Sequence, residues 1–278
     1  NRGVFAMNRR NFLINSALMG IGSLLAANAF ADSANKVKEA TADNDFLPNT
    51  GPGNKFDYDG QALRFKGNSL ISHVPQDSEF YQYLLHFQDK IRHSEIADRH
   101  VFLPKNSLHV TIFNGTNETL TQRDKAGFWP ADLPKDATIE AVHAHYLNKL
   151  KGFKPDLPKK LEFKPTELWT PFDKKGLTLG MELVHAEDKA KLIEFRRALN
   201  ELLQTSRNVP EKLDFHISLG YTWKKYSARL MESAEKKRVM WSQEFARHSP
   251  VLHIDQIEFA IFNDMLSYSP LHIFYLNK

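Results

Sequence analysis

The sequence predicts an α/β protein made of two similar lobes. In each half of the chain, a strand-like segment is followed by an amphipathic helix and then by a second strand. That second strand carries a histidine and, two residues later, a hydroxyl residue. Alternation of strands and helices in this order is typical of layered α/β folds. The composition agrees, because 42% hydrophobic and 25% charged residues are ordinary values for a globular protein with a sizeable core.

The first half begins after a polar stretch, residues 32–55, whose prolines and glycines predict a flexible leader. Periodicity then predicts strands over 56–65, 69–74 and 107–113 and helices over 79–93 and 138–151. Ser78 is a suitable N-cap for the first of these helices. The strand over 107–113 is bounded by Pro104 and by Asn114-Gly115, which are turn signals.

The second half repeats the order. Residues 152–176 look loop-rich around a short apolar run, 161–169. After them we expect strands over 177–184, 214–223, 251–262 and 271–277 and helices over 187–205 and 226–247. Residues 56–278 are therefore expected to form one two-lobed domain.

The N-terminal region predicts an export signal over residues 1–31. From Met7 the chain reads MNRRNFLINSALMGIGSLLAANAFADS, with paired arginines, a mildly apolar stretch and a small-residue cleavage site before Asp32. This pattern resembles a twin-arginine signal and implies a periplasmic or secreted location. The alternative is an N-terminal membrane anchor, but the apolar stretch is short and contains polar residues. We expect no stable membrane insertion after cleavage.

The charge distribution limits the choice of partners. The formal net charge is +4, and the first 31 residues contain three arginines and no acidic residue, so the remaining chain carries only about +1. An extended nucleic-acid surface is therefore not expected, and we expect a monomer. The chain has no cysteine, which excludes disulfides and cysteine-based metal sites.

The two histidine motifs are the strongest functional signal. They lie in SLHVTIF (107–113) and DFHISLG (214–220). Residues two apart in a strand share one face, so His109 is paired with Thr111 and His216 with Ser218, while the apolar neighbours point into the opposite layer. Chance predicts such a framed motif roughly 0.1 times in a chain of this composition. Two copies therefore favour a functional site over ordinary half-buried histidines.

Two imidazoles and two hydroxyls around one small group suit a phosphodiester. Histidine both accepts and donates a proton near neutral pH, so one histidine can activate the nucleophile while the other protonates the leaving oxygen. The hydroxyls of Thr111 and Ser218 can bind the non-bridging phosphate oxygens. This scheme requires no metal and no cofactor. We therefore predict His109 and His216 as catalytic residues and Thr111 and Ser218 as phosphate-binding residues.

The stretches PKNSLHVTIFNG (104–115) and KLDFHISLGYTW (212–223) resemble the 2H phosphoesterase superfamily, which is named for two His-x-Ser/Thr motifs. They look most like a bacterial branch described as a 2H phosphodiesterase-like domain of unknown function. The resemblance implies two pseudo-symmetric lobes, each a mainly antiparallel sheet with flanking helices, around a central cleft. It also implies metal-independent hydrolysis of a phosphodiester, often a 2′,3′-cyclic phosphate on a nucleotide or an RNA end. The export signal favours a small phosphodiester as the partner, although an oligonucleotide end stays possible.

Several other residues invite a functional interpretation. Asp214 precedes His216 by two residues and is a candidate for orienting its ring, although a solvated strand start is simpler. Alternation places Phe113 on the face of His109, where it could stack on a base, but a core position is simpler. Strict alternation places Tyr221 opposite His216. The pair His143 and His145 suggests a metal, but residues two apart on a helix do not share a face.

Two other functions compete with the phosphodiesterase. A cleft that captures a phosphorylated ligand without turnover would retain phosphate affinity and form no product. A metal-dependent hydrolase using the other histidines would lose activity on chelation.

Overall fold

The computed structural model describes residues 45–48, 50–168 and 176–276. The chain separates into two units, residues 1–46 and 47–278, and the fold described here is that of the second. The export signal predicted over 1–31 and most of the predicted leader lie outside the described residues. Among the described residues, no helix is long and apolar enough to span a bilayer.

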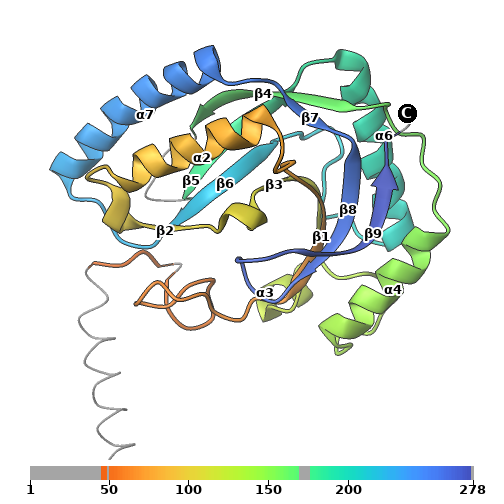
Figure 1. Cartoon of the computed structure of the whole chain (residues 1–278). Helices are drawn as coiled ribbons and strands as arrows, with labels where there is room; N and C mark the ends of the chain where they lie inside the picture. Colours follow the sequence, from red (N-terminus) through yellow and green to blue (C-terminus); the bar gives the residue numbers. More distant parts are fainter. Residues whose placement is uncertain (1–44, 49, 169–175, 277–278) are drawn as a thin grey trace, which may run out of the picture. The chain divides into compact units, whose positions relative to one another are not determined.

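The described residues form a mixed α/β structure whose centre is a nine-stranded sheet (Figure 1). Every pairing in the sheet is antiparallel. The sheet order is β7-β4-β5-β6-β3-β1-β8-β9, and β2 also pairs with β6. The strands are β1 (Gly67–His73), β2 (His100–Phe102), β3 (His109–Asn117), β4 (Leu161–Leu168), β5 (Leu177–Leu183), β6 (His216–Thr222), β7 (Leu252–Ile254), β8 (Gln256–Phe262) and β9 (Ser269–Tyr275). The predicted fold class is confirmed.

The helices follow the predicted ranges closely. They are α2 (Glu79–Arg92), α3 (Leu120–Arg123), α4 (Ile139–Lys151), α6 (Ala186–Leu203) and α7 (Ala228–His248), with short 3₁₀ turns at Ala97–Arg99 and Lys105–Ser107. Ser78 caps α2 as predicted, because its hydroxyl accepts a hydrogen bond from the backbone N–H of Tyr81 at 3.1 Å.

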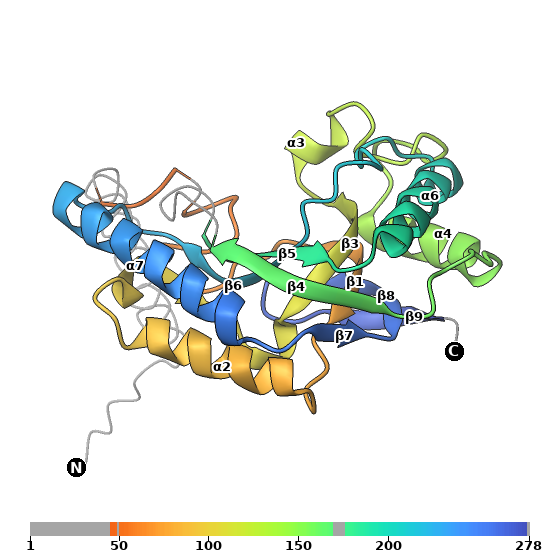
Figure 2. The same cartoon turned by 90° about the horizontal axis from the view of Figure 1, so that it is seen from above.

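The sheet curls because two strands that are far apart in the sheet order, β7 and β8, are joined by a single residue. Only Asp255 separates β7 from β8, yet β7 pairs with β4 and β8 pairs with β1. In a flat sheet these two strands would lie six spacings apart, about 29 Å. One linking residue spans only about 7 Å. The sheet therefore bends back on itself, as Figures 1 and 2 show.

The two lobes meet where β3 and β6 run side by side. The only residue pair of the β3–β6 ladder in the described chain is Val110 with Ile217. This seam divides the sheet into β3-β1-β8-β9 and β6-β5-β4-β7, the second group including β2. Gln88 of α2 donates hydrogen bonds to the carbonyls of Leu103 and Leu219. This side chain therefore links the segment before β3 to strand β6 beside the seam.

The lobes are interleaved along the chain, which corrects the expectation that each half of the sequence forms one lobe. The C-terminal strands β8 and β9 join β1, whereas β2 from the first half joins β6. The helices cross over as well (Figures 1 and 2): α2 packs against α7, with the rings of Phe87 and Phe245 4.6 Å apart, and α6 lies beside α4. Phe195 of α6 packs against Phe274 of β9.

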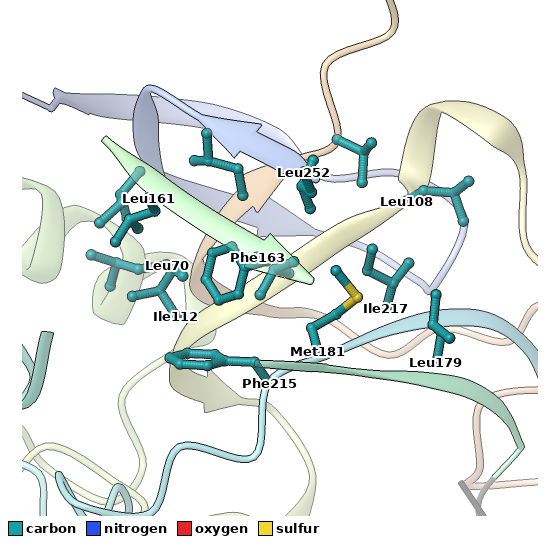
Figure 3. Packing of buried hydrophobic residues seen from close by; sticks show 14 of the residues in the cluster. Leu70, Leu108, Ile112, Leu161, Phe163, Leu179, Met181, Phe215, Ile217 and Leu252 are labelled. Atoms are coloured by element: carbon teal, nitrogen blue, oxygen red, sulfur yellow. The ribbon is translucent and has the colours of Figure 1, made fainter. Parts of the chain in front are cut away.

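One apolar core fills the interior of the curled sheet. Figure 3 shows side chains from several strands converging there, including Phe163 of β4, Phe215, which directly precedes β6, and Ile112 of β3. The rings of Phe163 and Phe215 lie 5.2 Å apart, edge to face. The strands contribute alternate residues to this core, which leaves their other face available for polar side chains.

Three strand predictions need correction. Residues 56–65 form no strand but a turn, in which the carboxylate of Asp57 accepts backbone hydrogen bonds from Asp59 and Gln61 and Gly60 has a φ of +77°. The apolar run in the loop-rich region is the long strand β4. The strand predicted over 251–262 is two strands, broken at Asp255.

Candidate functional site

The two histidine motifs lie on neighbouring strands. His109 begins β3 and His216 begins β6. The single pair Val110–Ile217 sets the antiparallel register, and this register turns His109 toward Ser218 and Thr111 toward His216. Each imidazole thus has the hydroxyl of the other motif across from it. The fold brings together all four residues that the sequence singled out.

The four side chains share the face of the sheet that is not packed in the core. Val110 and Ile217 have 0% exposure, whereas the four motif side chains are partly exposed. Thr111, His216 and Ser218 line a cavity of about 510 Å³. His109 and Thr111 line an adjoining cavity of about 320 Å³. Both volumes fall in the range of small-molecule sites.

Both imidazoles are oriented in the same way. Nδ1 of His109 donates to the carbonyl of Ser107 at 2.6 Å, and Nδ1 of His216 donates to the carbonyl of Asp214 at 3.0 Å. A carbonyl only accepts, so in the neutral ring the proton sits on Nδ1 and Nε2 is left as the proton acceptor. Asp214 therefore orients His216 through its backbone, while its carboxylate pairs with Lys212 at 3.2 Å.

The two motif strands carry a matched irregularity. Each has one extra residue three positions after its histidine: Ile112 in β3, opposite the Ile71–Leu70 step, and Leu219 in β6, opposite the Thr178–Leu177 step. Such a bulge reverses the alternation beyond it.

The reversal accounts for the core position that was the simpler interpretation of Phe113, and it changes the placement of Tyr221. Phe113 turns into the core with 1% exposure, and Asn114 takes its place at the cavities. Tyr221, placed opposite His216 by strict alternation, instead reaches Lys55 and Met265, which line the smaller cavity. Asn114 and Tyr221 both follow a motif histidine by five positions.

The surroundings of His109 disfavour its protonated form. Burial, with smaller contributions from His73 and His216, lowers its pKa to about 4, although the hydrogen bond to Ser107 opposes this shift. The ring of Tyr268 covers His109, with the ring centroids 4.2 Å apart. His109 is therefore neutral at physiological pH.

A second histidine stands beside His109 on the neighbouring strand. His73 of β1 pairs with His109 in the sheet, and their ring centroids are 6.3 Å apart. Nδ1 of His73 lies 2.6 Å from a carboxylate oxygen of Glu258, which has 2% exposure. Burial acts to raise the pKa of Glu258, but hydrogen bonds from His73 and Gln256 outweigh it and the net shift is downward. Glu258 is thus a buried anion that holds His73 in place.

The remaining candidates lie elsewhere. His145 pairs with Asp132 at 3.0 Å, and His143 is half-buried on the same helix. In the part of the chain that the structure describes, no group of three or more His, Asp or Glu side chains is placed to hold a metal ion. The cavity-lining residues Lys55, Asn68 and Arg207 were missed by the sequence reasoning, because isolated polar residues in loops and strand ends carry no periodic signal.

One family of known sequences matches part of the chain. Residues 55–170 match the family described as 2H-phosphodiest, "Domain of unknown function (DUF1868)". This stretch contains the first histidine motif, and the second lies beyond it. Over this stretch the match confirms the resemblance to a 2H phosphodiesterase-like domain. No curated protein sequence matches the chain.

Solved structures resemble the chain to different degrees, and the first described here shares its fold. A conserved protein of unknown function from Agrobacterium tumefaciens is 23% identical, with a TM-score of 0.70 over 79% of this chain and 90% of that one. LigT of E. coli in its apo form is 10% identical, with a TM-score of 0.41 over 78% of this chain and 100% of that one. Usb1 of Kluyveromyces marxianus with uridine monophosphate is 11% identical, with a TM-score of 0.39 over 77% and 99% of the two chains.

Proposed function

We propose that the protein hydrolyses a cyclic phosphodiester, such as a 2′,3′-cyclic nucleotide or the cyclic phosphate at an RNA end, with His109 and His216 as its general base and acid. The observation that carries this proposal is the shared orientation of the two rings. Each Nδ1 is held by a backbone carbonyl, and each imidazole faces the hydroxyl of the other motif. One phosphate held by Thr111 and Ser218 then lies between two imidazoles.

The reaction needs one proton to be taken and one to be given. His109 is neutral at pH 7 because its pKa is about 4, which suits it to accept the proton of the attacking water. The water oxygen bonds to phosphorus as the bond to the leaving ribose oxygen breaks. For this step His216 starts as the imidazolium, with a proton on each ring nitrogen, and it gives the Nε2 proton to the leaving oxygen. The product is a phosphate monoester. The hydroxyls of Thr111 and Ser218 donate to the phosphate oxygens as their charge increases.

Product formation from a panel of 2′,3′-cyclic nucleotides, with EDTA present, tests this proposal. We expect His109→Ala and His216→Ala each to lower kcat by about 10²- to 10⁴-fold. His253→Ala is the matched control, because His253 has the same apolar strand frame but is exposed on β7. Turnover that survives in the double variant His109→Ala/His216→Ala would refute the mechanism, and turnover that EDTA abolishes would favour the metal-dependent alternative.

The binding-protein alternative is separated by the same preparations. If the folded wild type binds a nucleoside monophosphate but forms no product from any cyclic substrate in the panel, capture without turnover is the better description. The export signal and the periplasmic or secreted location remain part of the proposal, and fractionation of cells producing the full chain tests them.

A further inference from the structure

The smaller cavity beside His109 is strongly biased toward anions. Its wall includes the side chains of Lys55, His109 and Arg207, and no carboxylate is among the residues that line it. Lys55 donates a hydrogen bond to the hydroxyl of Tyr221 at 3.0 Å and lies over the rings of Tyr221 and Phe65. Two cations without an acidic neighbour are more than a single phosphodiester requires.

Arg207 is a cation that the protein does not neutralise. It stands on the wall shared by both cavities, next to Thr111. Its Nη1 donates to the carbonyl of Gly115 at 2.8 Å and to the amide of Gln122 at 3.1 Å, and its guanidinium lies 4.8 Å from the ring centroid of Phe128. Among the described residues, none of the ion pairs formed by carboxylates includes Arg207. Burial lowers the pKa of Arg207, as expected for a charge that is partly removed from water.

The position of Arg207 is fixed by its neighbour in the chain. Asn208 has 4% exposure, and its side chain accepts from the backbone N–H of Asn114 and donates to the Asn114 carbonyl, both at 2.9 Å. The amide thus imitates a strand residue and ties the loop to β3. Because Asn114 follows the bulge, this clamp places Arg207 at the motif strand rather than in solvent.

Asn68 supplies an unused donor in the same cavity. Its side chain has 1% exposure, and its Oδ1 accepts from the backbone N–H of Thr116 at 3.2 Å. Among the described residues its Nδ2 has no hydrogen-bond partner, and a buried donor of this kind costs free energy unless a ligand satisfies it. Asn68 packs directly on Gly115, whose carbonyl binds Arg207. Asn68 and Arg207, which come from different parts of the chain, therefore both contact Gly115 at the wall of this cavity.

We propose that Arg207 and Asn68 form a second anion subsite, which binds a phosphate monoester on the same substrate as the phosphodiester. The inference rests on the proposed function, because it takes the reacting phosphodiester to lie at His109 and His216. A guanidinium and an amide donor match the several acceptor oxygens of a phosphate group. The preferred substrate class is then a cyclic phosphodiester that carries an additional terminal phosphate.

Calorimetric titration with two product-like ligands tests the subsite. Adenosine 2′-monophosphate and adenosine 2′,5′-bisphosphate differ only in the additional phosphate. We expect the wild type to bind the bisphosphate at least about tenfold more tightly at low ionic strength, and we expect this preference to shrink as salt is added. Equal affinities, or no binding of either ligand by the folded wild type, would overturn the subsite.

Variants assign the preference to Arg207. Arg207→Gln should remove the preference and leave the affinity for the monophosphate within about twofold, while Arg207→Lys, which keeps the charge but not the planar fork, should retain part of it. Arg197→Gln is the matched control, because it is the same substitution at an exposed arginine paired with Glu194 and Glu211. Thermal unfolding checks that each variant is folded. A preference that persists in folded Arg207→Gln would refute the assignment to Arg207. If the variant does not fold, the comparison of the two ligands in the wild type still tests the subsite.

Hydrolysis of adenosine 2′,3′-cyclic phosphate in the same preparations separates the two proposals. Turnover without a bisphosphate preference would refute the subsite and keep the proposed function. The opposite outcome is a bisphosphate preference that depends on Arg207, with no turnover of adenosine 2′,3′-cyclic phosphate or of its 5′-phosphorylated form. That outcome would support the subsite and refute the proposed function for these substrates.

Discussion

The ring of Tyr268 covers the imidazole of His109, and we expect this cover to contribute to the lowered pKa of His109. Their ring centroids are 4.2 Å apart, and Tyr268 is itself held against Phe262 and Met265. Replacing Tyr268 by Ala would open this side of the imidazole to water. Since burial is the largest cause of the lowered pKa of His109, hydration should raise that pKa from about 4 toward its ordinary value.

The size of the effect follows from the two limits. A pKa of about 4 lies well below the ordinary 6.5, and the difference corresponds to roughly 3 kcal/mol between the two protonation states. At pH 5.5 a histidine of pKa 4 is about 3% protonated, and one of pKa 6.5 is about 91% protonated. We expect Tyr268→Ala to raise the pKa of His109 to about 5 or higher.

Two measurements check this prediction. The imidazole proton shifts of His109 in NMR give its pKa directly, and kcat/KM against pH gives it through the acid limb, because a protonated His109 cannot act as the base. In Tyr268→Ala the acid limb should move to higher pH. Tyr268→Phe, which keeps the ring, is the control and should leave the limb in place. An unchanged pKa of His109 in folded Tyr268→Ala would show that Tyr268 does not produce the shift.

Two further predictions concern stability. His100 has 6% exposure and a pKa lowered to about 3, chiefly by burial, so the unfolded chain binds more protons between about pH 3 and 6.5 and stability falls as pH falls through this window. His100→Asn should remove about 1.4 kcal/mol per pH unit from that slope in urea titrations, and an unchanged slope would contradict the assignment. Gly115→Ala would place a Cβ 2.1 Å from the side-chain oxygen of Asn68; we expect a loss of about 1–3 kcal/mol in the same assay. Gly152→Ala, whose nearest neighbour is 4.0 Å away, should be tolerated, and equal losses in the two variants would contradict the packing argument.

The sequence predicted those parts of the fold that depend on local periodicity. The helix beginning after Ser78 and the second motif strand were placed within one or two residues, because their apolar positions repeat at the helical or strand period. The first motif strand was predicted to end at 113, but β3 continues through the expected turn at Asn114-Gly115 to Asn117. The strand β4 was missed because Lys164 and Pro165 interrupt its apolar run and prolines surround it. Pairing partners depend on long-range register, which periodicity does not report, so the interleaving of the lobes was not foreseen.

The same distinction applies to the candidate site. The four motif residues were found because each pair lies two apart on one strand, and a short sequence pattern is enough to identify such a pair. Tyr221 was placed on the wrong face because the extra residue Leu219 reverses the alternation in β6. Asn114 was interpreted only as a turn signal, whereas β3 continues through it and Asn114 lines the cavities. Arg207 was not found at all, since its role depends on the loop that Asn208 ties to β3.

The interleaving has a consequence for how the protein is made. Residues 252–275 supply β7 to one lobe and β8 and β9 to the other. During synthesis both lobes stay incomplete until these last strands have been translated. The first motif strand is therefore made long before the strands that complete its own lobe. We expect both imidazoles to reach their final positions only after this late step. A ribosome-bound chain that ends before residue 252 should have no phosphodiesterase activity, although it contains every residue of the two motifs.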